Sequence, residues 1–265
     1  MNVPRGTSAH IWSVVNQKGG VGKTTTAVNL ATAFAAMGDN VLLIDLDPQG
    51  NATTSLGLSS QQREVTVYDA FNGEDDSIAH YIQETYIPGL SILAGSMDLS
   101  GIDIELYDRK DKFYILKNKL SYIKDKYQFI IIDCPPSLGF LTVNAMCAAT
   151  GVLVPLQCEF FALEGLSQLL HTVEKLQANL NPQLEVEGIV LTMFDQRNKL
   201  SAQVSEDVRE YLGSMVYNTI VPRNVRLSEA PSYGKPALIY DLHCVGSQAY
   251  LRLAKEIKVR LLEAV

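Results

Sequence analysis

The amino-acid sequence predicts an α/β fold in which helices flank a doubly wound, mostly parallel sheet. Two observations carry this prediction. Short apolar runs, typical of strands that are buried on both faces, recur along the chain. Segments with helical spacing of apolar residues lie between these runs, and repeated strand–helix units give a parallel sheet with right-handed crossovers. The expected strands span residues 11–15, 41–44, 90–93, 129–132, 152–155 and 189–193.

The expected helices follow from apolar stripes in residues 27–37, 113–123, 163–176 and 250–261. Residues 134–158 carry no charge and could be mistaken for a membrane span. However, Pro135, Pro136 and Pro155 interrupt this stretch, whereas a spanning helix needs about 20 largely uninterrupted apolar residues. We interpret it as a loop, a buried helix and a buried strand.

Length and composition favour one globular domain. The chain has 265 residues, of which 47% are hydrophobic, and this suits a single α/β domain over residues 11–265. Residues 1–10 lack an apolar segment and predict a short disordered tail, not a signal peptide. The four cysteines include no C-x-x-C pair, so neither a disulfide framework nor a zinc site is expected. The expected setting is the reducing cytoplasm.

The net charge of −7 is unevenly distributed. Residues 197–260 contain ten Lys/Arg against six Asp/Glu, a local balance of +4, so the rest of the chain carries −11. This asymmetry permits a basic, nucleic-acid-binding face on an acidic protein. The alternative is an ordinary solvated surface with chance unevenness.

A glycine-rich segment follows the first expected strand directly. Residues 16–25 read N-Q-K-G-G-V-G-K-T-T and run into the first expected helix. Glycines allow backbone N–H groups to approach phosphates, and the helix presents its positive end. The pattern predicts that Lys23 holds the β- and γ-phosphates of ATP and that the Thr24 hydroxyl binds Mg²⁺. The competing interpretation is a purely structural glycine turn.

This loop departs from the usual phosphate-loop pattern because Gln17 replaces the first glycine and Lys18 adds a second lysine. The segment K-G-G-V-G-K-T resembles the deviant Walker A motif of P-loop NTPases of the ParA/MinD group. The resemblance implies a nucleotide-sandwich homodimer in which Lys18 contacts the partner's phosphates, so that both lysines are catalytic. It assigns ATP binding to Lys18, Gly19, Gly20, Val21, Gly22, Lys23, Thr24 and Thr25.

Three carboxylates complete the expected site. Asp45 and Asp47 follow the second expected strand in D-L-D-P-Q-G-N, and Asp133 ends the apolar strand F-I-I-I-D. The resemblance places Asp45 and Asp133 beside Mg²⁺ and gives Asp47 the role of orienting the attacking water. The implied metal set is Thr24, Asp45, Asp47 and Asp133.

Two later segments are similar to the ParA/Soj signature: T-M-F-D-Q-R at 192–197 and V-P-R-N-V-R-L-S-E-A-P-S-Y-G-K-P at 221–236. The resemblance implies that Met193, Pro222 and Asn224 approach the adenine base. It also implies that Arg197 and Arg226 bind double-stranded DNA without sequence preference. For these arginines the alternative is ordinary surface charge.

The implied function is chromosome or plasmid segregation by a slow, Mg²⁺-dependent ATPase. Its partners would be a second copy of the chain, nucleoid DNA and a ParB-like adaptor that stimulates hydrolysis, and no stable membrane association is expected. Ten residues cannot hold a helix-turn-helix, so operator binding is not expected either. The strongest alternative is a MinD-like, membrane-cycling ATPase that uses residues 248–265 as an amphipathic helix. A reductase related to nitrogenase iron protein and a metabolic kinase or synthetase are further alternatives.

Overall fold

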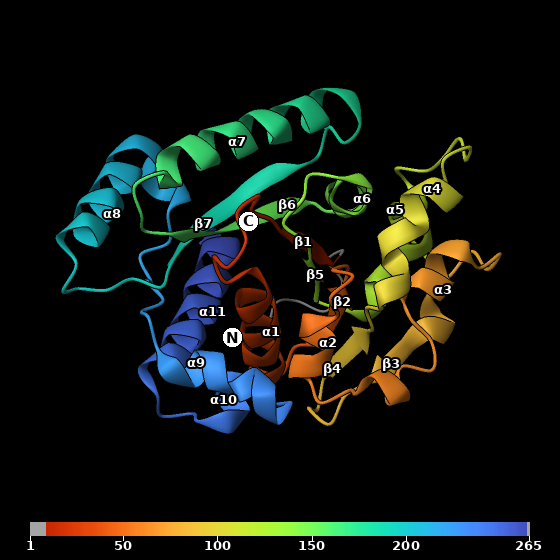
Figure 1. Ribbon diagram of the computed structural model, residues 1–265, viewed down its shortest axis with the longest axis horizontal. Helices are drawn as coiled ribbons and strands as arrows, with labels where there is room; N and C mark the ends of the chain where they lie inside the picture. The colour runs from red at the N-terminus through yellow and green to blue at the C-terminus, as the bar shows by residue number, and fades with distance from the viewer. Residues whose placement is uncertain (1–8, 264–265) are drawn as a thin grey trace.

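A single seven-stranded sheet organises the chain (Figure 1). The computed structural model describes residues 9–263. Within them the strand order is β3-β4-β2-β5-β1-β6-β7, and only β3 runs antiparallel to its neighbour. The strands are β1 (His10–Val14), β2 (Val41–Asp45), β3 (Ile82–Glu84), β4 (Leu90–Leu93), β5 (Phe129–Asp133), β6 (Gly151–Gln157) and β7 (Glu185–Thr192).

The predicted doubly wound α/β fold is confirmed. Each of the six predicted strands is present, within a few residues of its expected bounds. The short strand β3 was missed because three residues, I-Q-E, form no apolar run. The uncharged stretch 134–158 contains a loop, a buried helix and a buried strand, as predicted.

Helices cover both faces of the sheet. Figure 1 shows α1 and α11 on one face and α6 and α7 on the other. The helix predicted over 113–123 is shorter in the structure. The helices are α1 (Lys23–Ala36), α2 (Asn51–Ser55), α3 (Val67–Asn72), α4 (Ile102–Glu105), α5 (Ile115–Leu120), α6 (Phe140–Ala148), α7 (Ala162–Asn179), α8 (Lys199–Leu212), α9 (Val225–Glu229), α10 (Ala237–Tyr240) and α11 (Val245–Glu263).

Alternation along the buried strands divides the core between the two faces, because successive side chains of a strand point in opposite directions. In β2, Leu42 and Ile44 pack beneath α5 and α6, whereas Val41 and Leu43 pack beneath α1 and α11. This arrangement explains why the strands read as unbroken apolar runs.

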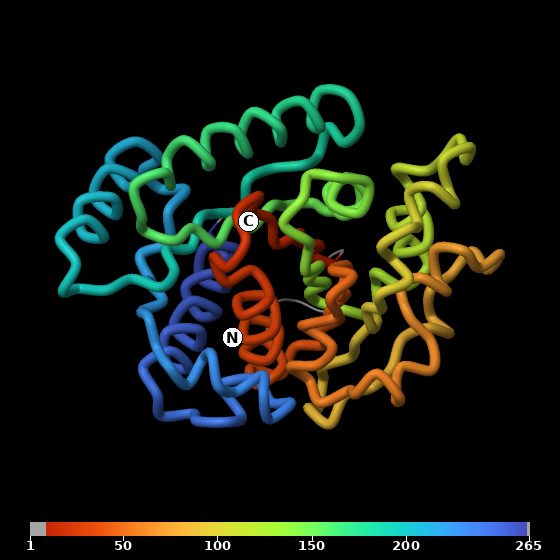
Figure 2. Tube along the Cα trace, in the orientation of Figure 1, coloured from red at the N-terminus to blue at the C-terminus, as the bar shows by residue number. Residues whose placement is uncertain are grey.

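Segments from opposite ends of the chain lie side by side. The tube in Figure 2 shows the red helix α1 beside the blue helix α11. The Thr26 hydroxyl shares a 3.0 Å hydrogen bond with the Tyr250 hydroxyl. At the far end, the buried Lys258 amine donates to the Asp39 carboxylate at 2.6 Å. The C-terminal helix therefore fixes the helix that follows the phosphate loop.

The N-terminal boundary differs slightly from the expected one. The predicted tail covers residues 1–10, but Ala9 is buried and His10 begins β1. These two residues belong to the folded part of the chain because the His10 backbone N–H donates to the Gln128 carbonyl at 3.0 Å. The rest of the predicted tail, residues 1–8, lies outside the described residues.

Candidate active site

The strand order places a crevice at the carboxyl end of β1. The chain leaves β1 toward β2 on one side and later crosses from β5 to β6 on the other side. Ligands of open parallel sheets bind where crossovers diverge in this way. The glycine-rich segment occupies this position because it links β1 to α1.

Backbone geometry explains the glycines of this segment. Gly22, which precedes α1, has φ +92°, and Gly20 has φ +78°. Side chains strain a backbone with positive φ, so glycine is the natural residue at both positions. The Thr26 N–H donates to the Gly22 carbonyl at 2.8 Å and starts the helix. The first N–H groups of α1 precede this hydrogen bond, so they remain available to a ligand in the crevice.

Neighbouring strands hold the segment in place. The Asn16 amide donates to the Pro155 carbonyl of β6 at 2.8 Å and accepts a 2.9 Å hydrogen bond from the Lys18 N–H. The Thr192 hydroxyl at the end of β7 donates to the buried Val21 carbonyl at 2.8 Å. Contacts with β6 and β7 thus fix the loop on the side that faces the sheet, and its opposite side is open.

Lys23 lies at the base of the crevice. Its side chain is almost fully buried, and its amine donates to the Lys18 carbonyl at 3.0 Å. Burial lowers the pKa of Lys23, whereas the carboxylates of Asp133 and Asp47 oppose this shift. The two acids favour the protonated amine despite its burial, so Lys23 can keep the positive charge that an anion binds.

A cavity of about 640 Å³ opens above the loop. It has room for a polyphosphate and brings together residues of the loop, of the segment after β2 and of the segment after β5. Its lining includes Gly19, Gly20, Gly22, Lys23, Thr24, Thr25, Asp47, Pro48, Gln49, Asn51, Ser100, Pro135, Pro136 and Met193.

The three predicted carboxylates have different surroundings. Asp47 lines the cavity, and its carboxylate accepts a 2.9 Å hydrogen bond from the Gln49 N–H. Asp45 is fully buried behind the cavity and accepts hydrogen bonds from the Thr53 N–H at 2.7 Å and the Thr53 hydroxyl at 2.6 Å. Burial raises the pKa of Asp45 to about 6 despite these hydrogen bonds. Asp45 therefore anchors α2 in this structure, while Asp47 faces the open space.

Asp133 has buried carboxyl oxygens without a partner. Neither oxygen accepts a hydrogen bond from any described residue. Burial, followed by the nearby Asp45, raises the pKa of Asp133 well above its usual value. Among the described residues no three acids are grouped closely enough to hold a metal ion by themselves, but the unpaired Asp133 carboxyl and the adjacent Thr24 hydroxyl are the hard oxygen ligands that Mg²⁺ prefers. The residues present therefore fit a magnesium site.

A smaller recess of about 120 Å³ adjoins the loop, and Met193, Pro222 and Asn224 all line it together with Gly22. Met193 is the only described non-glycine residue with positive φ, at +49°. The Arg223 N–H donates to the Phe194 carbonyl at 3.0 Å, which joins the two signature segments. The three residues expected at the adenine base are thus adjacent to the phosphate loop.

Both predicted DNA-binding arginines are exposed and already form ion pairs. Arg197 contacts Asp195 through two hydrogen bonds of 3.1 Å. Arg226 contacts Glu229 at 2.9 Å and approaches Asp241 at 3.5 Å. They lie on the loop after β7 and on α9, within the two joined signature segments. Arg223, which sequence reasoning did not single out, is also exposed there.

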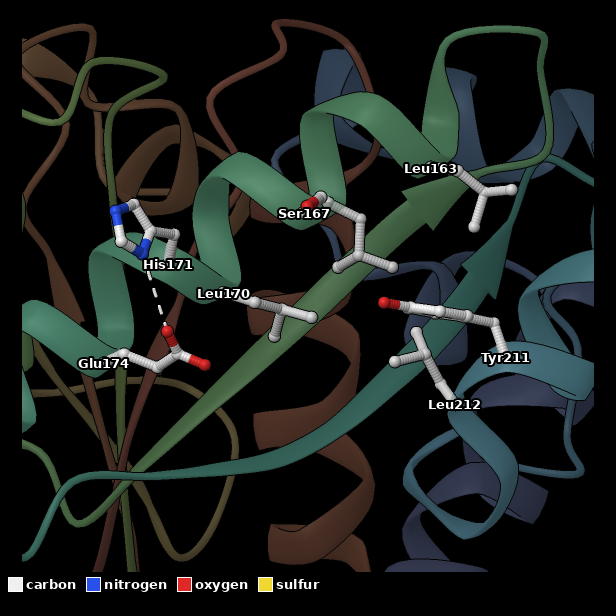
Figure 3. A pocket seen from close by; sticks show the side chains of 8 residues that line it. Leu163, Ser167, Leu170, His171, Glu174, Tyr211 and Leu212 are labelled. Atoms are coloured by element: carbon white, nitrogen blue, oxygen red, sulfur yellow. Dashed lines mark ion pairs between the residues drawn. The ribbon is translucent and has the colours of Figure 1, made fainter.

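An apolar groove of about 450 Å³ lies elsewhere, between α7 and α8 (Figure 3). Leu163 and Leu170 of α7 face Tyr211 and Leu212 of α8, and His171 pairs with Glu174 at 3.5 Å. No lysine, arginine or glycine lines this groove. It lacks the groups that hold phosphates and is separate from the candidate site.

Sequence reasoning missed several residues that shape the site. Thr53 holds Asp45, and Ser100 lines the main cavity. Glu159, after β6, forms an ion pair with Lys18. None of the three belongs to a motif with its own chemistry. The only available signal was position, since Thr53 and Glu159 follow strands that end at the catalytic edge of the sheet.

The four cysteines are all free. Cys134 follows Asp133 directly but is buried, and its burial raises the pKa of the thiol. A buried thiol with a raised pKa lacks the character of a nucleophile.

Comparison with known proteins agrees with this geometry. A family model described as AAA domain matches residues 9–186. The chromosome partitioning protein ParA of Caulobacter vibrioides is 55% identical over 249 residues, covering 93% of each chain. The sporulation initiation inhibitor protein Soj of Bacillus subtilis is 49% identical over 247 residues, covering 93% of this chain and 97% of Soj.

A solved structure supports the same fold. The cobyrinic acid a,c-diamide synthase of Mycobacterium smegmatis, crystallised with ADP and magnesium, superposes with a TM-score of 0.80 at 35% identity, covering 93% of each chain. ParA and Soj, at 55% and 49% identity, are closer to this chain in sequence than the synthase is. The chain therefore belongs to the ParA/Soj family of chromosome-partitioning ATPases.

Proposed function

We propose that this ATPase binds ATP and Mg²⁺, closes into a sandwich dimer around two nucleotides, and then holds DNA without reading its sequence. The observation that carries the proposal is the convergence of Lys23, Thr24 and Asp47 on one cavity, with a recess for a base beside it. A ParB-like adaptor stimulates hydrolysis and so releases the dimer from the nucleoid in the cytoplasm. The result is segregation of chromosomal or plasmid DNA.

The residues of the cavity have separate roles in phosphoryl transfer. Lys23 and the N–H groups of the loop hold the β- and γ-phosphates by charge and hydrogen bonds. Thr24 and Asp133 would hold Mg²⁺, which would supply positive charge to stabilise the phosphates. Asp45 orders the inner edge of this site through Thr53. Asp47 faces the cavity and orients the attacking water.

The position of Lys18 favours action in trans. Its side chain does not line the cavity of its own subunit and is 53% exposed. A second copy facing this edge would bring its γ-phosphate toward the lysine. Positive charge supplied in trans stabilises the transition state of phosphoryl transfer in other switches.

Membrane binding through α11 is disfavoured by its contacts. The apolar stripe of α11, including Tyr250, Leu253 and Ile257, is buried against the rest of the domain. Lys258 pairs with Asp39, and Arg260 donates to the Ser214 and Val216 carbonyls. The main apolar stripe of α11 is therefore unavailable to lipid, and the residues left exposed, including Arg252, Lys255, Val259 and Leu262, form a mixed face. Among the described helices, none is long and apolar enough to cross a bilayer.

DNA binding is tested by replacing the two exposed arginines. Arg197→Ala or Arg226→Ala removes two phosphate contacts from a dimer. The slope of log K against log salt should therefore flatten by roughly 1.8, at about 0.9 per contact. Glutamate at either position should weaken binding to every duplex about equally. Fluorescence anisotropy with two unrelated duplexes, with and without ATP, measures both effects.

Lys117→Ala is the matched control for this experiment. Lys117 is an exposed residue of α5, which Figure 1 shows at the opposite end of the molecule from α8 and α9. Lys117→Ala changes the net charge by the same amount as either arginine-to-alanine variant, but it should leave the slope of log K against log salt unchanged. If the wild-type protein ignores DNA in every nucleotide state, the DNA-holding step of the proposal is wrong.

A further inference from the structure

The connection between β6 and α7 lies beside the phosphate loop. β1 and β6 are parallel neighbours, with Val14 opposite Leu153, so both strands end at the same edge of the sheet. The Val15 N–H donates to the Leu153 carbonyl at 3.0 Å, and Asn16 reaches Pro155. Residues that follow β6 therefore meet residues that follow β1. Glu159 lies at this meeting point.

Glu159 forms an ion pair with Lys18 of the same subunit. The backbone of Lys18 is also engaged, because its N–H donates to Asn16 at 2.9 Å and its carbonyl accepts from the Lys23 amine at 3.0 Å. Among the described residues, no other carboxylate pairs with Lys18. Lys18 is thus held along its own edge of the sheet.

We propose that Glu159 is a positioning residue for Lys18 that keeps this lysine in cis until a second subunit brings its ATP phosphates. This inference rests on the proposed dimer. Closure moves the Lys18 ammonium from the Glu159 carboxylate to the partner's phosphates, so the ion pair opposes closure. Glu159 does not line the phosphate cavity of its own subunit, and its ion pair is with Lys18, so it acts through that lysine.

The exposure of the pair sets the size of the effect. The side chain of Lys18 is 53% exposed and that of Glu159 is 30% exposed, so water screens their attraction. Such a pair shifts an equilibrium by at most about five-fold. Each of the two subunits must open its own pair, and the populations of the open state multiply. The dimer dissociation constant therefore changes by up to about 25-fold.

Glu159→Gln tests this inference because it removes the charge and keeps the shape. In sedimentation experiments with a non-hydrolysable ATP analogue, the dimer dissociation constant should fall by up to about 25-fold. The control is Glu164→Gln, an exposed glutamate in the first turn of α7 that forms no ion pair with a described residue. This control should dimerise like wild type. An unchanged or weaker Glu159→Gln dimer contradicts the inference.

Lysine labelling without nucleotide gives a second readout that needs no dimer. An amine-reactive reagent, read by mass spectrometry, should label Lys18 several-fold faster in Glu159→Gln, while the labelling of buried Lys23 stays the same. In wild type, raising the salt concentration should speed Lys18 labelling relative to Lys23, because salt screens an exposed pair. Equal Lys18 labelling in all these samples contradicts the positioning role, whether or not the variant folds well.

Failure of the proposed sandwich dimer and failure of the proposed role of Glu159 give different results. If wild type does not dimerise with the analogue, the proposed sandwich dimer is wrong, and the labelling result still decides whether Glu159 restrains Lys18. If wild type dimerises but Glu159→Gln changes neither the dimer nor the labelling, only the role of Glu159 is wrong.

Discussion

Replacing Lys23 with alanine should weaken ATP binding at least about 30-fold and, at the upper end of the expected range, abolish it in practice. The lysine amine is buried at the base of the cavity, where its only hydrogen bond to a described residue is to the Lys18 carbonyl. A triphosphate placed above the loop loses its buried cationic partner in this variant. Loss of one member of a buried charged pair costs about 2–5 kcal/mol, which weakens binding by roughly 30-fold to several thousand-fold. Titration with a fluorescent ATP analogue measures the loss.

Lys18→Ala should fail at a different step. The Lys18 side chain lies outside its own cavity, and alanine retains the backbone carbonyl that receives the Lys23 amine. We therefore expect ATP affinity close to that of wild type, but no ATP-dependent dimer in multi-angle light scattering. Lys117→Ala, which removes an exposed lysine from α5, should behave like wild type in both assays. If both loop variants bind ATP and dimerise normally, the assignment of the phosphate loop is wrong.

The sequence predicted the sheet and the loop because their signals are local. A buried parallel strand must be apolar on both faces, so the run F-I-I-I-D of β5 could be recognised without knowing its neighbours. The phosphate loop needs glycines with positive φ, and Gly20 and Gly22 have them. Such features are determined within a few residues of the chain.

The missed features depend on contacts between distant segments. Glu159 meets Lys18 only because β6 lies next to β1, and no pattern within residues 157–161 shows this. Thr53 lies only eight residues after Asp45, but its role is also hidden in the sequence, because no local pattern shows that its hydrogen bonds turn Asp45 inward. An acid that follows a strand can face the cavity or anchor a neighbouring helix. Sequence alone could not separate Asp45 from Asp47 on this point.

Asp47→Ala should trap the protein as an ATP-bound dimer. Asp47 lines the cavity, while Lys23 and the N–H groups of the loop remain in place to hold the phosphates. Assembly should therefore survive and hydrolysis should not. Orientation and activation of a nucleophile by one side chain contribute about 10²–10⁴-fold to a rate, so hydrolysis should fall by at least about a hundredfold. Phosphate release and light scattering with ATP measure the two quantities on one sample.

Asp47→Asn separates the chemistry of this residue from its structural contact. The asparagine oxygen can still accept the hydrogen bond that Asp47 takes from the Gln49 N–H at 2.9 Å, but it carries no charge. If the carboxylate orients the water, both variants accumulate as ATP-bound dimers with slow hydrolysis. If Asp47→Asn hydrolyses ATP like wild type while Asp47→Ala does not, the residue acts by shaping the loop. Loss of ATP binding in both variants would instead make Asp47 a ligand of the bound metal, because the affinity for nucleotide would then depend on its charge.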